Sequence, residues 1–174
     1  MLTRDQIAGY HAFGYLLLKG CLTPEETAAV EAAYERVMAD APRYDYFDTG
    51  GTRKLNGCEE IDPVLARFIA HRKIIEAMCQ LWGAPGIFVG SDIWSNMDDT
   101  PWHTDGMPGR VRGTVKVTTY LDEMTAEQGS LNLLPGTHLP SCSNNLFKNC
   151  GYFDRSRPRL RLQPDQVPGV VSLH

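Results

Sequence analysis

His103 and Asp105 are the two residues of this sequence whose types and spacing point most directly to chemistry. One residue separates them in the stretch Trp102-His103-Thr104-Asp105-Gly106. Residues i and i+2 of a strand project to the same side, so both side chains could reach one ion. An imidazole and a carboxylate are two of the three donors that hold non-haem Fe(II), the third being a second histidine. The alternative is a histidine that bonds to a loop carboxylate with no metal.

The composition predicts a globular protein that acts on small molecules. The chain has 174 residues, of which 43% are hydrophobic and 22% are charged, and its net charge is −4. This length suits a single domain, 1–174. There is no basic run to bind nucleic acid, and no apolar run reaches the ~20 residues that a membrane span needs. We therefore expect neither a nucleic-acid partner nor a membrane partner.

The cysteines predict a reducing compartment. Their number is odd and no two of them form a C-x-x-C pair, which argues against a disulfide framework or a zinc ribbon. The first residues lack the basic and apolar regions of a secretion signal. We expect reduced thiols and a cytoplasmic location. The five cysteines are Cys21, Cys58, Cys79, Cys142 and Cys150.

The N-terminal part, 1–84, shows helix signals. Two capping boxes, Thr3 with Gln6 and Thr23 with Glu26, predict two helices, and the first is expected to end near Gly14. In a capping box the two side chains bond to each other's backbone N–H, which satisfies donors that the helix leaves unpaired.

Other segments of this part carry weaker signals. The apolar run Tyr15–Gly20 predicts a strand, and Arg43–Gly57 predicts a long loop or a loop with a short strand. The stretch Asp62–Gly83 predicts two helical segments with one buried face. His71, between polar neighbours, is expected to face solvent or to cap a helix.

The C-terminal part, 85–174, is rich in strand-like runs separated by turn signals. Helices followed by strands favour an α+β, mainly β fold, in which a β-sandwich or jelly roll has helices packed on one sheet. A jelly roll suits a metal site because strands of two sheets converge at its mouth. The expected strands are Ile87–Asn96, Val111–Leu121, Ser130–Leu134 and Val167–His174.

A series of motifs along nearly the whole chain resembles one protein family, the phytanoyl-CoA dioxygenase family of Fe(II)- and 2-oxoglutarate-dependent oxygenases. The Pro-Gly-Thr-His motif is the most specific of them. In chain order the motifs are Thr3-x-x-Gln6 with Gly14-Tyr15-Leu16, Leu22-Thr23-Pro24-Glu25-Glu26, His103-Thr104-Asp105, Tyr120-Leu121-Asp122, Glu127-Gln128-Gly129-Ser130-Leu131 and Leu134-Pro135-Gly136-Thr137-His138.

This resemblance implies a double-stranded β-helix, the cupin-like jelly roll, with His103 and Asp105 as two iron ligands. It also implies that Fe(II), 2-oxoglutarate and O2 together hydroxylate an unactivated carbon of a small organic substrate. Imidazole and carboxylate donors leave open positions on the metal, as such a reaction requires. Relatives that halogenate lack the carboxylate, so Asp105 favours hydroxylation.

The resemblance also suggests neighbours of the co-substrate. Thr118, Ile93, Asn96 and Lys54 fall near positions that contact 2-oxoglutarate in the family. The alternatives are that Thr118 and Ile93 belong to the core and that Lys54 is solvated. We expect His138 to be structural, with its imidazole bonded to the backbone.

The chain departs from the family pattern at its end. The third ligand and an arginine for 2-oxoglutarate lie on later strands, and Val170–His174 resembles the strand just before them, so His174 is not expected to be that ligand. We therefore expect a truncated product or a fragment of a longer enzyme whose C-terminal strands are missing. Two other hypotheses remain: a truncated, catalytically inactive family member that acts as a binding module, and a cupin-like enzyme that uses another metal.

Overall fold

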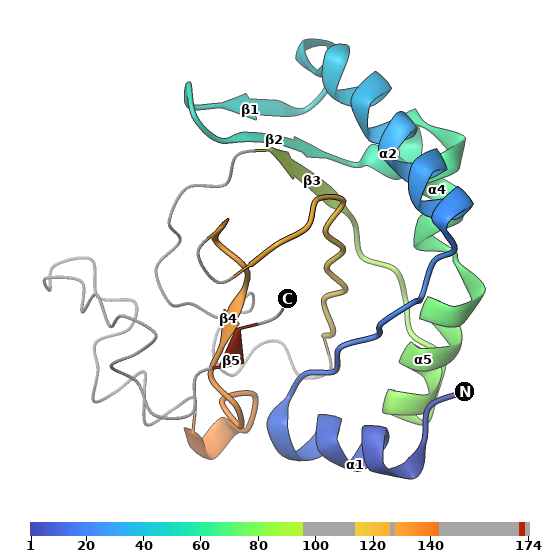
Figure 1. The fold of residues 1–174 in the computed structure, drawn as a ribbon, viewed down its shortest axis with the longest axis vertical. Helices are drawn as coiled ribbons and strands as arrows, with labels where there is room; N and C mark the ends of the chain where they lie inside the picture. The colour runs from blue at the N-terminus through green and yellow to red at the C-terminus, as the bar shows by residue number, and fades with distance from the viewer. Residues whose placement is uncertain (96–113, 126–127, 143–170, 173–174) are drawn as a thin grey trace, which may run out of the picture. The chain divides into compact units, whose positions relative to one another are not determined.

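The computed structural model contains two compact units. One consists of Met1 and residues 18–100, and the other of residues 2–17 and 101–174. Four helices and a three-stranded sheet belong to the first unit, while α1 and the β4–β5 pair belong to the second (Figure 1). The structure describes residues 1–95, 114–125, 128–142 and 171–172.

Helix α1, Arg4–Phe13, begins as its capping box predicts. The Gln6 backbone N–H donates to Thr3 Oγ1 at 3.2 Å, and the Thr3 backbone N–H donates to Gln6 Oε1 at 2.8 Å. The helix ends at Gly14, whose φ of 87° is the left-handed conformation that glycine adopts at helix C-termini. Both predicted ends of this helix are confirmed.

The Pro-Gly-Thr-His turn binds the C-terminal end of α1. The Gly136 N–H donates to the Phe13 carbonyl at 2.8 Å, and His138 Nε2 donates to the His11 carbonyl at 3.1 Å. These bonds satisfy carbonyls that the last helical turn leaves unpaired. The structural role predicted for His138 is confirmed, because its imidazole bonds to the backbone.

The second unit contains one described strand pair. Strand β4, Asn132–Leu133, runs antiparallel to β5, Val171–Ser172. These strands lie inside two of the expected strands. The expectation of a strand over Val111–Leu121 is wrong for residues 114–121, which belong to no strand. β-Forming residues favour extended backbone, but a strand also needs a hydrogen-bonded partner.

Helix α2, Pro24–Ala39, also starts at a capping box and contributes much of the core of the first unit. A short 3-10 helix, η1 (Ala41–Arg43), follows it. Every buried apolar residue among those described lies in this unit. These residues are Val30, Ala33, Val37, Met38, Ala41, Leu55, Cys58, Leu65, Ile74, Ala77 and Leu81.

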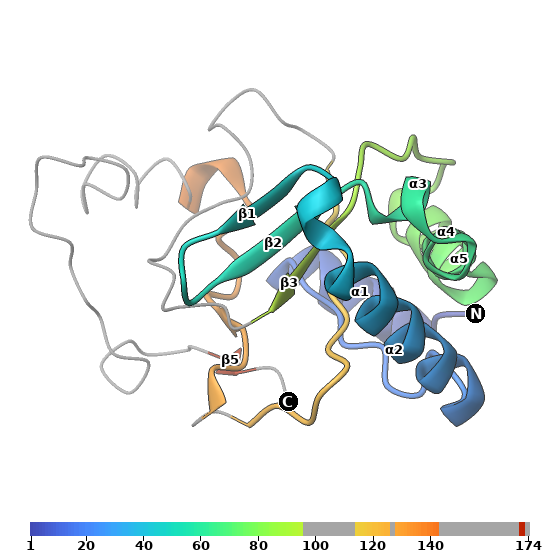
Figure 2. The ribbon, with the colours of Figure 1, turned by 90° about the horizontal axis from the view of Figure 1, so that it is seen from above.

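Two helices account for the stretch Asp62–Gly83, as predicted. They are α4, Pro63–Ile69, and α5, Arg72–Trp82, which lie beside α2 in Figure 2. A short helix that the sequence did not predict, α3 (Cys58–Ile61), precedes them. None of the helices in the described ranges is long and apolar enough to cross a membrane.

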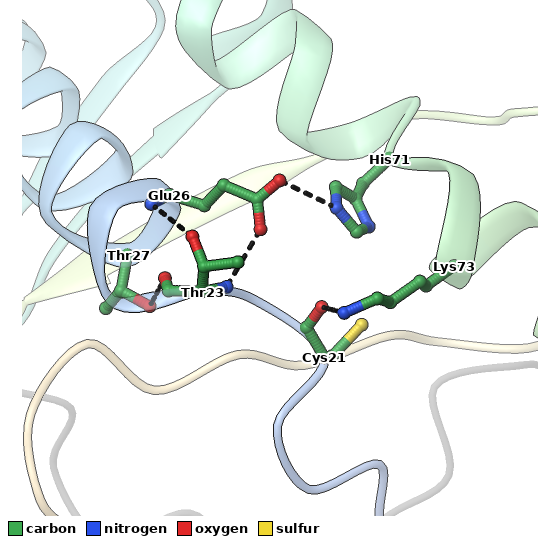
Figure 3. A network of polar contacts seen from close by, with 6 residues as sticks. All are labelled: Cys21, Thr23, Glu26, Thr27, His71 and Lys73. Atoms are coloured by element: carbon green, nitrogen blue, oxygen red, sulfur yellow. Dashed lines mark hydrogen bonds and ion pairs between the residues drawn. The ribbon is translucent and has the colours of Figure 1, made fainter.

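The capping box of α2 extends into a network that reaches α5 (Figure 3). Glu26 Oε2 accepts the Thr23 backbone N–H at 2.8 Å, and Glu26 Oε1 lies 3.3 Å from His71 Nε2. Lys73 Nζ donates to the Cys21 carbonyl at 2.9 Å. The expectation that His71 faces solvent or caps a helix is wrong for its side chain, which is 17% exposed and makes no cap hydrogen bond. The partner lies 45 positions away in the sequence, so local polarity did not reveal it.

The sheet of the first unit consists of β1, Tyr46–Asp48, β2, Arg53–Asn56, and β3, Asp92–Ser95. All neighbours are antiparallel, and β2 lies in the middle (Figure 2). The expected loop at 43–57 thus contains two short strands. The strand expected over Ile87–Asn96 forms only at Asp92–Ser95 among the residues described.

The strand predicted at Tyr15–Gly20 is wrong. The segment has neither helical nor strand structure, and Leu17 is 41% exposed. It contains the boundary between the two units, which falls after Leu17. An apolar run resembles a strand in the sequence, but here it connects two units. The double-stranded β-helix remains a prediction, with which the helices and the small antiparallel sheet are consistent.

Candidate functional site

The sheet β1-β2-β3 places side chains on two opposite faces. Tyr46, Leu55 and Ile93 pair across the three strands, so their side chains share one face. This is the inner face, because Leu55 is fully buried. The opposite face, called the Lys54 face below, carries Phe47, Lys54, Asn56, Asp92 and Trp94.

Lys54 is held by two residues of β3. Its Nζ lies 3.1 Å from Asp92 Oδ2 and 4.8 Å from the centroid of the Trp94 ring. Both charged side chains are 27% exposed, so solvent screens the pair less than an ion pair on the open surface. The alternative that Lys54 is simply solvated is therefore wrong: its ammonium has a fixed counter-ion and an aromatic neighbour.

The structure separates the remaining predicted site residues. Ile93 follows Asp92 on β3, so its side chain lies on the inner face, opposite that of Lys54. One small molecule on a single face would contact one of these side chains and not the other. Thr118 is exposed and lies in the second unit, outside any strand. His103, Asp105 and Asn96 lie outside the described residues.

The chemistry of the donor set fits Fe(II) at the His-x-Asp motif. One neutral imidazole and one carboxylate are the nitrogen and oxygen donors that this metal takes in oxygenases, with positions left for other ligands. Within the ranges that the structure describes, no three His, Cys, Asp or Glu side chains are grouped to hold a metal ion. The His-x-Asp motif therefore stays the candidate metal site of the chain.

The described cysteines do not offer an alternative chemistry. Cys21, Cys58, Cys79 and Cys142 form no disulfides, as predicted. Burial raises the pKa of the Cys58 thiol, and the nearby carboxylate of Glu59 raises it further, although the hydrogen bond with Ser91 opposes them. Burial also raises the pKa of Cys21. Because the thiolate is the reactive form, neither residue is suited to act as a nucleophile at neutral pH.

A second carboxylate of the sheet lies on the face opposite to Lys54. Asp48 pairs with Arg53 across β1 and β2, and its Oδ2 accepts the Tyr46 hydroxyl at 2.9 Å. The Gly50 N–H, followed by that hydroxyl, holds the pKa of Asp48 below its ordinary value. Asp48 thus carries the same charge as Asp92 but on the other side of the sheet.

Sequence reasoning named Lys54 but missed Asp92 and Trp94. The available signal was the alternation Asp92-Ile93-Trp94, in which the first and third residues share a face. Identifying them as partners of Lys54 also required the register, in which Trp94 pairs directly with Lys54. That register joins segments some 40 residues apart in the sequence, so it could not be read from local pattern.

Comparisons with known proteins give a consistent family. Residues 10–149 match the family model described as phytanoyl-CoA dioxygenase (PhyH). The chain is 28% identical over 193 aligned positions to proteins named ectoine dioxygenase from Bordetella parapertussis and Bordetella bronchiseptica, which covers 99% of this chain and 60% of each relative. An ectoine dioxygenase from Sphingopyxis alaskensis is 29% identical over 157 positions, with coverages of 79% and 50%. No solved structure gives a significant match.

The extent of these matches sets what they establish. The chain spans about 60% of the length of the two Bordetella relatives. Because the relatives carry the names of enzymes, they give no support to an inactive binding module. The family match extends over most of the chain and includes His103 and Asp105. The chain therefore belongs to the phytanoyl-CoA dioxygenase family.

Proposed function

We propose that the protein is an Fe(II)- and 2-oxoglutarate-dependent dioxygenase that hydroxylates an unactivated carbon of a small organic solute. The observation that carries this proposal is the His103-x-Asp105 motif inside the family match over residues 10–149. The names of the relatives add a substrate class, because all those compared are called ectoine dioxygenase. Ectoine and solutes like it are therefore the first substrates to try.

In this proposal His103 and Asp105 hold the metal. A further histidine completes the donor set of this class of iron site. With Fe(II) bound, the site couples the oxidation of 2-oxoglutarate by O2, which gives succinate and CO2, to insertion of the second oxygen atom into a C–H bond. A carboxylate at position 105 occupies the coordination position that a halide would need, which favours hydroxylation over halogenation.

Lys54 is the proposed co-substrate residue with the best-defined surroundings. Its ammonium is fixed on the Lys54 face, where a carboxylate of 2-oxoglutarate can pair with it. Thr118, Ile93 and Asn96 are proposed as further neighbours of the co-substrate. Since Ile93 lies on the inner face, it would contribute through the packing of β3 and not through the surface on which Lys54 lies.

We also propose the architecture that the family implies. Residues 1–174 would form a single domain, in which the helical part supports a jelly roll built from residues 85–174. The antiparallel sheets β1-β2-β3 and β4-β5 support this proposal, since a jelly roll consists of antiparallel strands. The four unbridged cysteines support a cytoplasmic location.

A turnover assay tests the proposed reaction. The purified chain would be incubated with Fe(II), ascorbate, 2-oxoglutarate and ectoine in air, and succinate and product would be measured by mass spectrometry. We expect succinate together with a product that carries one added oxygen atom. The His103→Ala variant should form neither, because it lacks a metal donor.

The controls separate the reaction from the substrate. Succinate formation that needs Fe(II) and His103 but leaves ectoine unchanged would reject ectoine and retain the reaction class. Equal succinate formation by the wild type and the His103→Ala variant would contradict the proposed function, because the metal site would then play no part.

A further inference from the structure

The environment of Lys54 suggests how the affinity for the co-substrate is set, an inference that rests on the proposed function. A lysine that binds an anion usually presents its charge to the ligand. Here the ammonium already has a carboxylate, Asp92, at 3.1 Å. An incoming carboxylate must therefore either share Lys54 with Asp92 or replace Asp92.

The arrangement follows from the register of β2 and β3. Trp94 lies directly opposite Lys54, and Asp92 lies opposite Asn56, two residues farther along each strand. Both β3 side chains are thus on the same face as Lys54 and within reach of its Nζ. Phe47 flanks Lys54 on β1 and is 57% exposed, while Trp94 is 37% exposed. The ammonium therefore lies between two aromatic side chains that limit its movement.

The two contacts act on Lys54 in different ways. The Trp94 ring attracts the cation through its π face and fixes its position without neutralising it. Asp92 neutralises it, and its negative charge would also repel a dicarboxylate that approaches Lys54. Removing each contact should therefore change anion binding in opposite directions.

We propose that Asp92 is a specificity-determining residue that competes with 2-oxoglutarate for Lys54, and that Trp94 is a positioning residue that holds the ammonium in place. Competition by Asp92 would disfavour weakly charged anions, because only a ligand that offsets the lost Lys54–Asp92 pair can bind. A dicarboxylate meets this requirement better than a monocarboxylate.

The test measures the dissociation constant of 2-oxoglutarate by anaerobic calorimetry on the full chain loaded with Mn(II), which does not turn over. The Asp92→Asn variant should bind 2-oxoglutarate about tenfold more tightly, because the variant removes a like charge beside the ligand. Lys54→Met should weaken binding. Trp94→Leu should also weaken it, and Trp94→Phe should restore it because phenylalanine keeps an aromatic face.

Asp48→Asn is the matched control for Asp92→Asn. It removes the same charge from the same sheet, but on the opposite face. It should leave the dissociation constant within about twofold of the wild type, because most of the sheet separates this charge from Lys54. Circular dichroism and thermal unfolding would confirm that each variant is folded, and Asp92→Ser provides a second neutral variant if Asp92→Asn is not.

Each outcome has a distinct meaning. Tighter binding by Asp92→Asn, with Asp48→Asn unchanged, supports the inference. Unchanged or weaker binding by folded Asp92→Asn, while Lys54→Met still weakens binding, overturns the inference and retains the proposed role of Lys54. Binding that Lys54→Met leaves unchanged overturns both the inference and that role. A wild-type chain that binds Mn(II) but no 2-oxoglutarate contradicts the proposed function itself.

Discussion

At the scale of single residues, the Asp62 carboxylate joins two helices of the first unit. Asp62 Oδ1 accepts the Val64 N–H at 2.7 Å and caps α4, while Asp62 Oδ2 pairs with Arg36 of α2 at 2.9 Å. Burial opposes its charge, but the Val64 N–H and the Arg36 guanidinium outweigh burial and hold the pKa of Asp62 below its ordinary value. The side chain is only 12% exposed, so its loss should be felt.

Replacing Asp62 by alanine should lower the free energy of unfolding by about 2 kcal/mol, since it removes a helix cap and leaves Arg36 unpaired. Asp62→Asn should cost about half as much, because asparagine is also a good N-cap but carries no charge. Urea unfolding followed by circular dichroism measures both values.

Asp40→Ala is the control for this prediction. Asp40 also pairs with an arginine, Arg43, but both side chains are well exposed and Asp40 makes no cap hydrogen bond. Its loss should cost no more than about 0.5 kcal/mol. Equal losses for Asp40→Ala and Asp62→Ala would show that the cap and the burial of Asp62 do not matter.

Glu26 makes the stability of the first unit depend on pH. The Thr23 backbone N–H, followed by the hydrogen bond with His71, outweighs desolvation and holds the pKa of Glu26 below its ordinary value. A depressed pKa means that the carboxylate stabilises the fold above the pKa of the unfolded state. This contribution is lost as pH falls below about 4 and through the lower folded pKa.

Comparison with Glu26→Gln isolates this contribution, since glutamine can still form the capping box. The wild type should be more stable than the variant at neutral pH, and the difference should shrink as the pH is lowered through the acidic range. Gln6→Glu should introduce the same pH dependence at the capping box of α1. A difference that stays constant down to about pH 3 would show that the Glu26 charge does not contribute.

At the scale of elements, helix starts were predictable and strand partners were not. A capping box is complete within four residues, so Thr3 with Gln6 and Thr23 with Glu26 were sufficient to place two helices. A strand depends on a partner far along the chain, so Tyr15–Gly20 was predicted as a strand although it connects two units. The turn at Pro135–His138 was recognised, but its contact with α1 was not.

That contact predicts an unusual cost for Gly14→Ala. A Cβ at Gly14 would overlap the imidazole of His138, and φ is +87°. Gly14→Ala should therefore lower the free energy of unfolding by about 3 kcal/mol, from backbone strain and overpacking together. Thermal and urea unfolding measure this loss.

Gly20→Ala and His138→Ala complete the experiment. Gly20 also has a positive φ, +64°, but a Cβ there would meet none of the described atoms within 4 Å, so its loss should be only about 1 kcal/mol. In the Gly14→Ala background, His138→Ala should recover part of the stability, because it removes the overlap. Additive losses of the two substitutions would contradict the close contact.

At the scale of the whole molecule, the sequence located the chemistry better than it located the chain that surrounds it. The types of His103 and Asp105, and the order of the motifs, identified the family that the comparison over residues 10–149 confirms. The counter-ion of Lys54 could not be predicted, because it depends on the register between β2 and β3. The role of His138 could be predicted as structural, but only the structure shows which helix it binds.

The central claim is that His103 and Asp105 hold Fe(II) for 2-oxoglutarate. Anaerobic titration of the chain with Fe(II) and 2-oxoglutarate, followed by visible absorption, measures this directly, because chelation of Fe(II) by the keto acid gives a weak metal-to-ligand charge-transfer band. The variants are Asp105→Ala and, as a control from the same acidic stretch of the sequence, Asp98→Ala. We predict a band in the wild type and in Asp98→Ala that Asp105→Ala weakens or abolishes. A folded wild-type chain without the band, or a band of equal strength in Asp105→Ala, would contradict the account.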